Sequence, residues 1–183
     1  IQIRYEVKGA SLLSQIRVFN PDTKSLPWGF GTHAYFNIPL VARSQKTACS
    51  ISIPSEILLT LDDCLPTGHR TPAGPEKSLR HGRCFEGLKA DDVYSALIPD
   101  GDAVVCRIDD ADAQVRFEQK CSTDFRELVV FTPWWSSSVC MEPYTCMTNA
   151  INLQQDGIDA GLHVLQPGQQ WTGFIDMYVV PLD

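Results

Sequence analysis

The chain opens with Ile1-Gln2-Ile3-Arg4-Tyr5-Glu6-Val7-Lys8, in which apolar and polar side chains alternate strictly. Successive side chains of a β-strand point to opposite faces of a sheet, so this stretch predicts a half-buried strand. The same alternation recurs around residue 115, where Val115 and Phe117 stand between polar or charged neighbours. The pattern therefore predicts a β protein.

Short apolar or alternating runs recur throughout the sequence, and no stretch has a convincing helical period. Turn-forming residues such as Asn20-Pro21-Asp22 and Pro99-Asp100-Gly101 separate the runs, and residues 65–87 form the longest irregular stretch. Many short strands with turn signals between them predict an all-β fold, an antiparallel β-sandwich or a barrel. The further predicted strands are Ser14 to Phe19, Thr32 to Ile38, Ala48 to Ile53, Ile57 to Leu61, Val93 to Leu97, Ala103 to Ile108, Glu127 to Thr132 and Thr172 to Val180.

Composition narrows the class of protein. A chain of 183 residues suits one domain, residues 1–183, with a sizeable core. The net charge of -7 argues against nucleic acid as a partner, and no apolar run is long enough to cross a bilayer. The seven cysteines contain no C-x-x-C pair, which favours reduced thiols in a cytoplasmic protein over disulfides or a metal site.

A first candidate for chemistry lies in residues 28–38, Trp-Gly-Phe-Gly-Thr-His-Ala-Tyr-Phe-Asn-Ile. On a strand, alternation places His33, Tyr35 and Asn37 on one face and the apolar residues on the other. His33 thus belongs to a polar and aromatic face. From the residues alone, it is either a structural histidine or a catalytic one.

Two acidic segments are the other candidates. Glu142 stands between apolar residues and Pro143, where partial desolvation would move its pKa toward the range useful for proton transfer. The alternative is an exposed glutamate beside a strand end. Asp91 and Asp92 enter a strand together, so alternation sends only one of them into any pocket, and either could instead be a solvated turn residue.

Five short motifs, in this order, resemble those of the aldose 1-epimerase (galactose mutarotase) family. Together they span nearly the whole chain. They are Gly31-Thr32-His33-Ala34-Tyr35-Phe36-Asn37-Ile38, Leu65-Pro66-Thr67-Gly68, Asp91-Asp92-Val93-Tyr94, Glu142 with Asn149-Ala150-Ile151-Asn152, and Gly161-Leu162 with Pro167-Gly168.

The resemblance implies a β-sandwich of the galactose mutarotase-like supersandwich type and a cofactor-free enzyme that interconverts the α and β anomers of an aldose. It implies that His33 is the general acid, Glu142 the general base and Asp91 a sugar-binding residue. Tyr35 and Asn37, on the face of His33, are expected to contact the monosaccharide. No metal is implied.

The chain departs from the family pattern at its N-terminus. It begins within a predicted strand and without methionine, so we expect it to be the C-terminal part of a longer domain. Family members carry a further arginine and a second histidine in their N-terminal half, and neither has a positional match here. Unpaired strand edges would then favour a homodimer.

Two alternatives to the epimerase stay open. One is a non-catalytic carbohydrate-binding sandwich. The other is a hexose-phosphate 1-epimerase of the same superfamily, in which Arg70, Arg80 and Arg83 would hold the phosphate.

Overall fold

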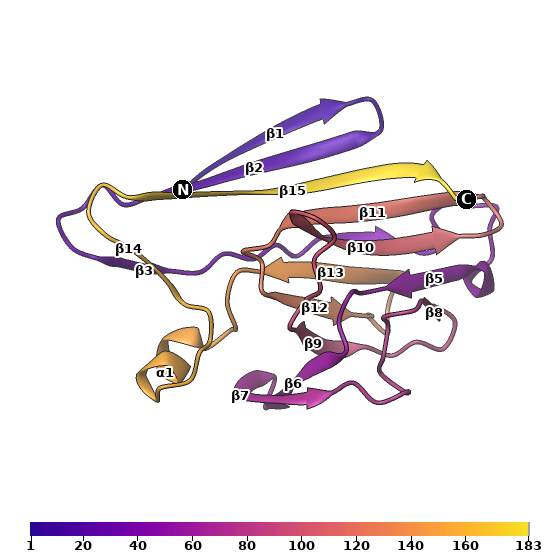
Figure 1. The fold of residues 1–183 in the computed structure, drawn as a ribbon. Helices are drawn as coiled ribbons and strands as arrows, with labels where there is room; N and C mark the ends of the chain where they lie inside the picture. Colours follow the sequence, from indigo (N-terminus) through magenta and orange to yellow (C-terminus); the bar gives the residue numbers. More distant parts are fainter. Residues whose placement is uncertain (183) are drawn as a thin grey trace.

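Two antiparallel β-sheets packed face to face dominate the computed structural model, which describes residues 1–182 (Figure 1). This arrangement confirms the predicted all-β sandwich. The larger sheet has seven strands, and most of its pairings join segments that are distant in sequence. In spatial order these strands are β1 (Gln2–Lys8), β2 (Ser11–Phe19), β15 (Gln170–Pro181), β11 (Val115–Ser122), β10 (Ala103–Asp110), β5 (Cys49–Ser52) and β8 (Arg83–Cys84).

The second sheet has six strands and carries the residues that concern function. A two-stranded ribbon of β3 (Leu26–Trp28) and β14 (His163–Leu165), a 3₁₀ turn at Lys46–Ala48 and one short helix, α1 (Ala150–Gln155), complete the elements of residues 1–182. The six strands, in spatial order, are β4 (Tyr35–Asn37), β13 (Ser138–Tyr144), β12 (Glu127–Phe131), β9 (Asp91–Ser95), β6 (Ile57–Asp62) and β7 (Leu65–Pro72).

The main core fills the space between the two sheets. Alternation directs one face of each sheet inward, so Ile51 and Ile108 of the larger sheet meet Leu128, Val130 and Met141 of the smaller one in a single cluster. All five side chains are completely buried. This cluster fixes which face of the six-stranded sheet points away from the core, and that outer face is the one that matters for function.

The outer face of the six-stranded sheet is partly covered as well. Helix α1 and its flanking loops place Met147 and Leu153 against Val93, forming a second apolar cluster. Strands β9 and β13 are therefore buried on both faces, with burial along nearly their whole length. A strand of this kind shows no period-two pattern, which explains why β13 is missing from the predicted strands.

Several local predictions were wrong. Strand β1 forms, but all seven of its residues are exposed, because it lies at the outer edge of the larger sheet and pairs only with β2 (Figure 1). Strand β4 begins at Tyr35, so His33 precedes it. Residues 65–72, expected to be irregular, form β7. Helix α1 has only six residues, too few for a detectable helical period.

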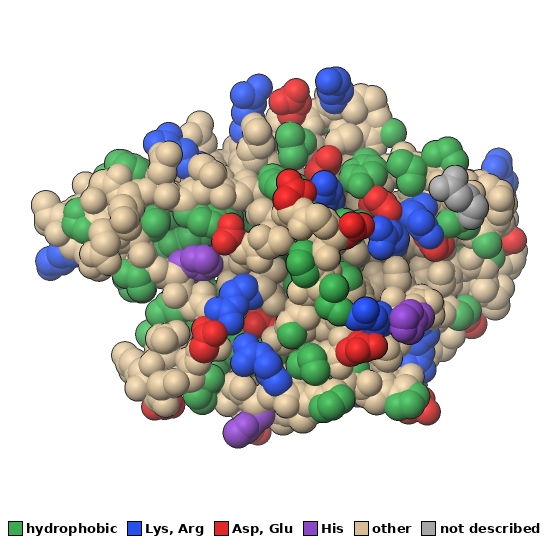
Figure 2. All heavy atoms as spheres, in the orientation of Figure 1, with side chains coloured by type: hydrophobic (Ala, Val, Ile, Leu, Met, Phe, Trp, Pro, Cys, Tyr) green, Lys and Arg blue, Asp and Glu red, His purple; other side chains and the backbone are tan. Residues whose placement is uncertain are grey.

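The charged side chains and the length of the helices concern two kinds of partner that the sequence argues against, nucleic acids and membranes. On the face of the described residues that Figure 2 shows, Lys and Arg side chains are interspersed with Asp and Glu. Side chains of both signs are therefore mixed on this face. Within residues 1–182, no helix is long and apolar enough to cross a membrane.

The assigned core predicts that two leucines of the six-stranded sheet contribute very differently to the free energy of unfolding. Leu128 is fully buried, whereas Leu65 is 48% exposed. Leu128→Ala should lower the free energy of unfolding by about 2–5 kcal/mol, because it leaves a cavity between the sheets. The matched control Leu65→Ala should change it by less than about 0.5 kcal/mol. Equal losses in urea unfolding would contradict the assigned core.

Candidate active site

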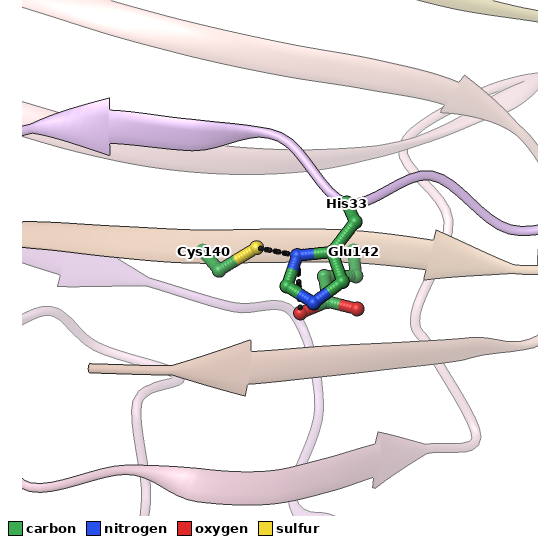
Figure 3. Close-up of side chains that lie close together, drawn as sticks. All are labelled: His33, Cys140 and Glu142. Atoms are coloured by element: carbon green, nitrogen blue, oxygen red, sulfur yellow. Dashed lines mark hydrogen bonds and ion pairs between the residues drawn. The ribbon is translucent and has the colours of Figure 1, made fainter. Parts of the chain in front are cut away.

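His33 and Glu142 meet on the outer face of the six-stranded sheet (Figure 3). The His33 Nδ1 atom lies 3.3 Å from the Oε1 atom of Glu142. Glu142 lies on β13 and is 3% exposed, which bears out the expected desolvation, whereas the His33 side chain is 58% exposed. The site therefore pairs a buried carboxylate with an imidazole that solvent can reach.

Close backbone packing holds His33 beside β13. Phe30 and Thr145 exchange two hydrogen bonds, and the Thr32 N–H donates to the Pro143 carbonyl over 3.3 Å. Gly31 permits this approach, because a Cβ atom there would lie 2.3 Å from the Tyr144 ring. The segment before β4 thus follows the end of β13 and brings the imidazole to the carboxylate.

Cys140 is the third member of this group. Its Sγ atom lies 3.0 Å from His33 Nδ1, and the thiol donates a hydrogen bond to the Ala34 carbonyl over 3.0 Å. Burial, followed by the neighbouring Glu142, raises the pKa of the Cys140 thiol well above its usual range. The thiol therefore stays protonated at neutral pH and acts as a polar neighbour of the pair.

Two tyrosines complete the immediate surroundings. The Tyr144 hydroxyl donates a 2.8 Å hydrogen bond to Glu142 Oε2, and burial together with this bond raises the pKa of Tyr144. The Tyr35 ring stacks on the His33 ring with centroids 5.2 Å apart. Desolvation, then Cys140 and Glu142, raise the pKa of Tyr35. Both phenols thus remain hydrogen-bond donors.

The remaining predicted residues lie farther along the same sheet. Asp91 is exposed and pairs across the strands with Phe131, which in turn pairs with Cys140, so all three share the outer face. Asp91 lines a hollow of about 640 Å³, separate from the pocket of about 340 Å³ that His33 and Tyr144 line. Asp92 points the other way and forms an ion pair with Lys77 at 2.5 Å.

Asn37 is exposed on β4 and lines a different hollow, next to Ser136 and Ser137. The structure therefore brings His33, Tyr35 and Glu142 together, whereas Asp91 and Asn37 line two separate hollows. The three arginines considered for phosphate binding do not converge. Their partners are three different glutamates, namely Glu127 for Arg70, Glu56 for Arg80 and Glu76 for Arg83.

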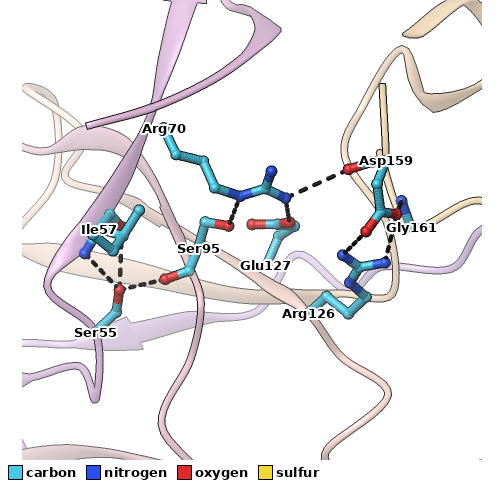
Figure 4. Close-up of polar contacts among 8 residues, drawn as sticks. All are labelled: Ser55, Ile57, Arg70, Ser95, Arg126, Glu127, Asp159 and Gly161. Atoms are coloured by element: carbon cyan, nitrogen blue, oxygen red, sulfur yellow. Dashed lines mark hydrogen bonds and ion pairs between the residues drawn. The ribbon is translucent and has the colours of Figure 1, made fainter. Parts of the chain in front are cut away.

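A second polar group surrounds Glu127, which the sequence did not single out (Figure 4). Glu127 is 1% exposed, and its Oε1 atom lies 3.7 Å from Arg70 Nη2. Its Oε2 atom has no hydrogen-bond partner within the described residues. Arg126 forms two hydrogen bonds with Asp159, at 2.9 Å and 2.8 Å. Burial outweighs the nearby guanidinium groups and raises the pKa of Glu127 to about 7.

Sequence reasoning also missed Cys140 and Tyr144 as site residues. Together with Glu142 they occupy alternate positions of β13 and share its outer face. That i, i+2, i+4 spacing would have indicated them if β13 had been recognised as a strand. Glu127 offered no such signal, because its burial depends on Arg70 and Asp159, which lie far from it in sequence.

Comparison with known proteins identifies the fold and the family of the chain. A galactose mutarotase-like protein from Clostridium acetobutylicum has a TM-score of 0.87 at 24% identity, over 98% of this chain and 55% of its own. A Synechocystis protein gives 0.73 at 20% identity, over 98% and 54%. A galactose mutarotase related enzyme from Lactobacillus acidophilus gives 0.69 at 18% identity, over 99% and 61%.

These structures define the fold as that of galactose mutarotase-like proteins, and the chain spans between half and two thirds of their length. The sequence model of the aldose 1-epimerase family matches residues 1–178. The chain belongs to the aldose 1-epimerase family.

The raised pKa of Glu127 predicts how stability depends on pH. The pKa of Glu127 is about 7 in the folded state, whereas the ordinary glutamate pKa is 4.5. Its contribution is therefore fully present below about pH 4.5 and is lost as the pH rises through 7. Relative to Glu127→Gln, the wild type should lose on the order of 3 kcal/mol between pH 5 and 8.

Urea unfolding at several pH values measures this difference. Glu76→Gln is the matched control, because the Glu76 side chain is 94% exposed and its removal should cause no such trend. A stability difference between wild type and Glu127→Gln that stays constant with pH would contradict the assignment.

Proposed function

We propose that this protein is an aldose 1-epimerase that interconverts the α and β anomers of a monosaccharide. The observation that carries the proposal is the contact of His33 Nδ1 with the buried Glu142 carboxylate at 3.3 Å, in a chain of this family. The pocket of about 340 Å³ that His33 lines is within the size range of small-molecule sites.

The proposed mechanism uses the pair as acid and base. Glu142 accepts the proton of the C1 hydroxyl while His33 protonates the ring oxygen, and the bond between C1 and the ring oxygen breaks to give the open-chain aldehyde. Rotation about C1–C2 presents the other face of the carbonyl. Reversal of both proton transfers closes the ring as the other anomer, and neither metal nor organic cofactor is required.

The ion-paired form of the site is the competent one, because the acid then carries its proton and the base has none. One contact supports this form, because the Tyr144 hydroxyl donates a hydrogen bond to the Glu142 carboxylate. The open side of His33 admits the sugar. Asp91 and Tyr35 are proposed to bind sugar hydroxyl groups or the sugar face, and Asn37 to contact the substrate at its margin.

Removal of either member of the pair should abolish most of the rate enhancement. His33→Ala and Glu142→Gln should each slow mutarotation, measured by polarimetry, by about 10²-fold or more, because acid–base catalysis typically contributes 10²–10⁴-fold. Asp91→Asn should raise KM with little change in kcat. His69→Ala and Glu76→Gln, both at exposed positions, are the matched controls. Unchanged mutarotation rates in His33→Ala and Glu142→Gln would contradict the proposal.

The alternatives give different results in the same assays. Sugar binding in calorimetry without any rate enhancement would favour the non-catalytic carbohydrate-binding sandwich. A preference for hexose phosphates would favour the phosphate-specific enzyme, although Arg70, Arg80 and Arg83 are each engaged with a different carboxylate. A cytoplasmic location is proposed as well, supported by seven cysteines that are all free thiols.

We also propose that the protein forms a homodimer through the free edge of β1. This edge strand pairs only with β2, and its Tyr5 and Val7 side chains are 65% and 76% exposed. The wild type should sediment as a dimer, and Tyr5→Lys/Val7→Lys should sediment as a monomer, because charged residues block pairing of edges. A wild type that remains monomeric at high concentration would rule this dimer out.

A further inference from the structure

Three different metal-binding side chains converge at the candidate active site. His33 Nδ1 lies 3.0 Å from Cys140 Sγ and 3.3 Å from Glu142 Oε1, and the ligand atoms of the group all lie within 4.8 Å of one another (Figure 3). In a tetrahedral zinc site, bond lengths of about 2.0–2.3 Å separate the donor atoms by roughly 3.3–3.7 Å. The two distances from His33 Nδ1 are at or just below this range, so small adjustments of the three side chains would enclose such an ion.

We propose that His33, Cys140 and Glu142 form a binding site for a thiophilic divalent cation, with Zn²⁺ the preferred ion. Zinc takes an imidazole nitrogen, a carboxylate oxygen and a thiolate as ligands in proteins, and the bound cation would displace the proton that the Cys140 thiol otherwise keeps. Three protein ligands leave a fourth position of the tetrahedron for water or a sugar hydroxyl. Mg²⁺ and Ca²⁺ require several oxygen ligands, so a site with a single carboxylate selects against them.

The surroundings hold these ligands in place. Cys140 and Glu142 are two residues apart on β13, so both side chains leave a rigid strand on the same face. Tyr144 fixes the carboxylate through its bond to Glu142 Oε2, which leaves Oε1 facing His33. Supporting hydrogen bonds of this kind orient ligands in natural metal sites. His33 is the exposed member, so rotation of its ring opens an entry path.

Metal binding has a consequence that rests on the proposed function, although binding itself does not. The ion would occupy the His33 nitrogen and the Glu142 oxygen that form the acid–base pair. A sugar could then no longer exchange protons with either group. Zn²⁺ would therefore inhibit mutarotation reversibly, and a chelator would restore the activity.

Titration with Co²⁺ tests binding without any measurement of activity. We expect one equivalent of Co²⁺ to produce visible d–d bands of tetrahedral intensity and a thiolate-to-cobalt charge-transfer band in the near ultraviolet. Zn²⁺ should displace the cobalt, and Mg²⁺ should not. Cys140→Ser should remove the charge-transfer band, and His33→Ala should weaken cobalt binding by at least about 10–100-fold, the loss that even supporting residues cause.

The chain provides its own control for the other thiols. Cys64 and Cys84 are the exposed cysteines, and the Cys64→Ser/Cys84→Ser double variant should keep the full cobalt spectrum. If Cys140→Ser does not fold, as judged by circular dichroism, His33→Ala decides, because its side chain is exposed. Absence of the bands in the wild type, persistence of the charge-transfer band in Cys140→Ser, unchanged cobalt affinity in His33→Ala, or loss of the bands in the double variant would overturn the proposal.

The activity assay separates this inference from the proposed function. A metal-free protein without mutarotase activity would contradict the function while leaving the cobalt result intact. An active protein that binds no cobalt would contradict only the metal site. Activity that persists with Zn²⁺ bound would show that the ion does not engage the catalytic pair, and would overturn the assigned ligands.

Discussion

Burial of strand β13 on both faces is the constraint on which the rest of the site depends. Its inward side chains, among them Met141, join the core between the sheets, while the outward Cys140 and Glu142 contact His33. A strand buried on both faces has little freedom to shift, since a slip by one residue would exchange its two faces. Glu142 and Cys140 lie on this strand, so their backbone positions are fixed with it.

The position of His33 depends on a different kind of contact. It lies in a segment without regular structure, yet its backbone neighbours are tied to β13 by hydrogen bonds at Phe30 and Thr32. Gly31 lets the segment approach the Tyr144 ring more closely than any side chain would permit. An irregular segment is thus attached to a buried strand at the point where the imidazole meets the carboxylate, which suits a residue that must exchange protons with a ligand.

Glu127 and Glu142 show how two buried carboxylates of one sheet differ through their partners. Glu142 has hydrogen-bonding groups on both oxygens, His33 on one side and Tyr144 on the other. Glu127 has the Arg70 guanidinium 3.7 Å from Oε1, and its Oε2 has no hydrogen-bond partner in the part of the chain that the structure describes. Burial outweighs the Ser95 hydroxyl and the guanidinium groups, so the pKa of Glu127 rises to about 7. Full satisfaction of a buried charge, more than burial itself, therefore distinguishes the candidate base.

Sequence by itself determined the β-sandwich and the residues to examine. Alternation located strands such as β2 and β11, and the ordered motifs indicated His33, Glu142 and Asp91. The sequence could not reveal β13, because burial on both faces removes the period-two pattern. It could not reveal the exposure of β1 either, because that depends on what lies opposite its face. Only the tertiary structure decided that Cys140 and Tyr144 join the pair and that Asp91 lies in a neighbouring hollow, because these relations arise from strand register and packing between distant segments.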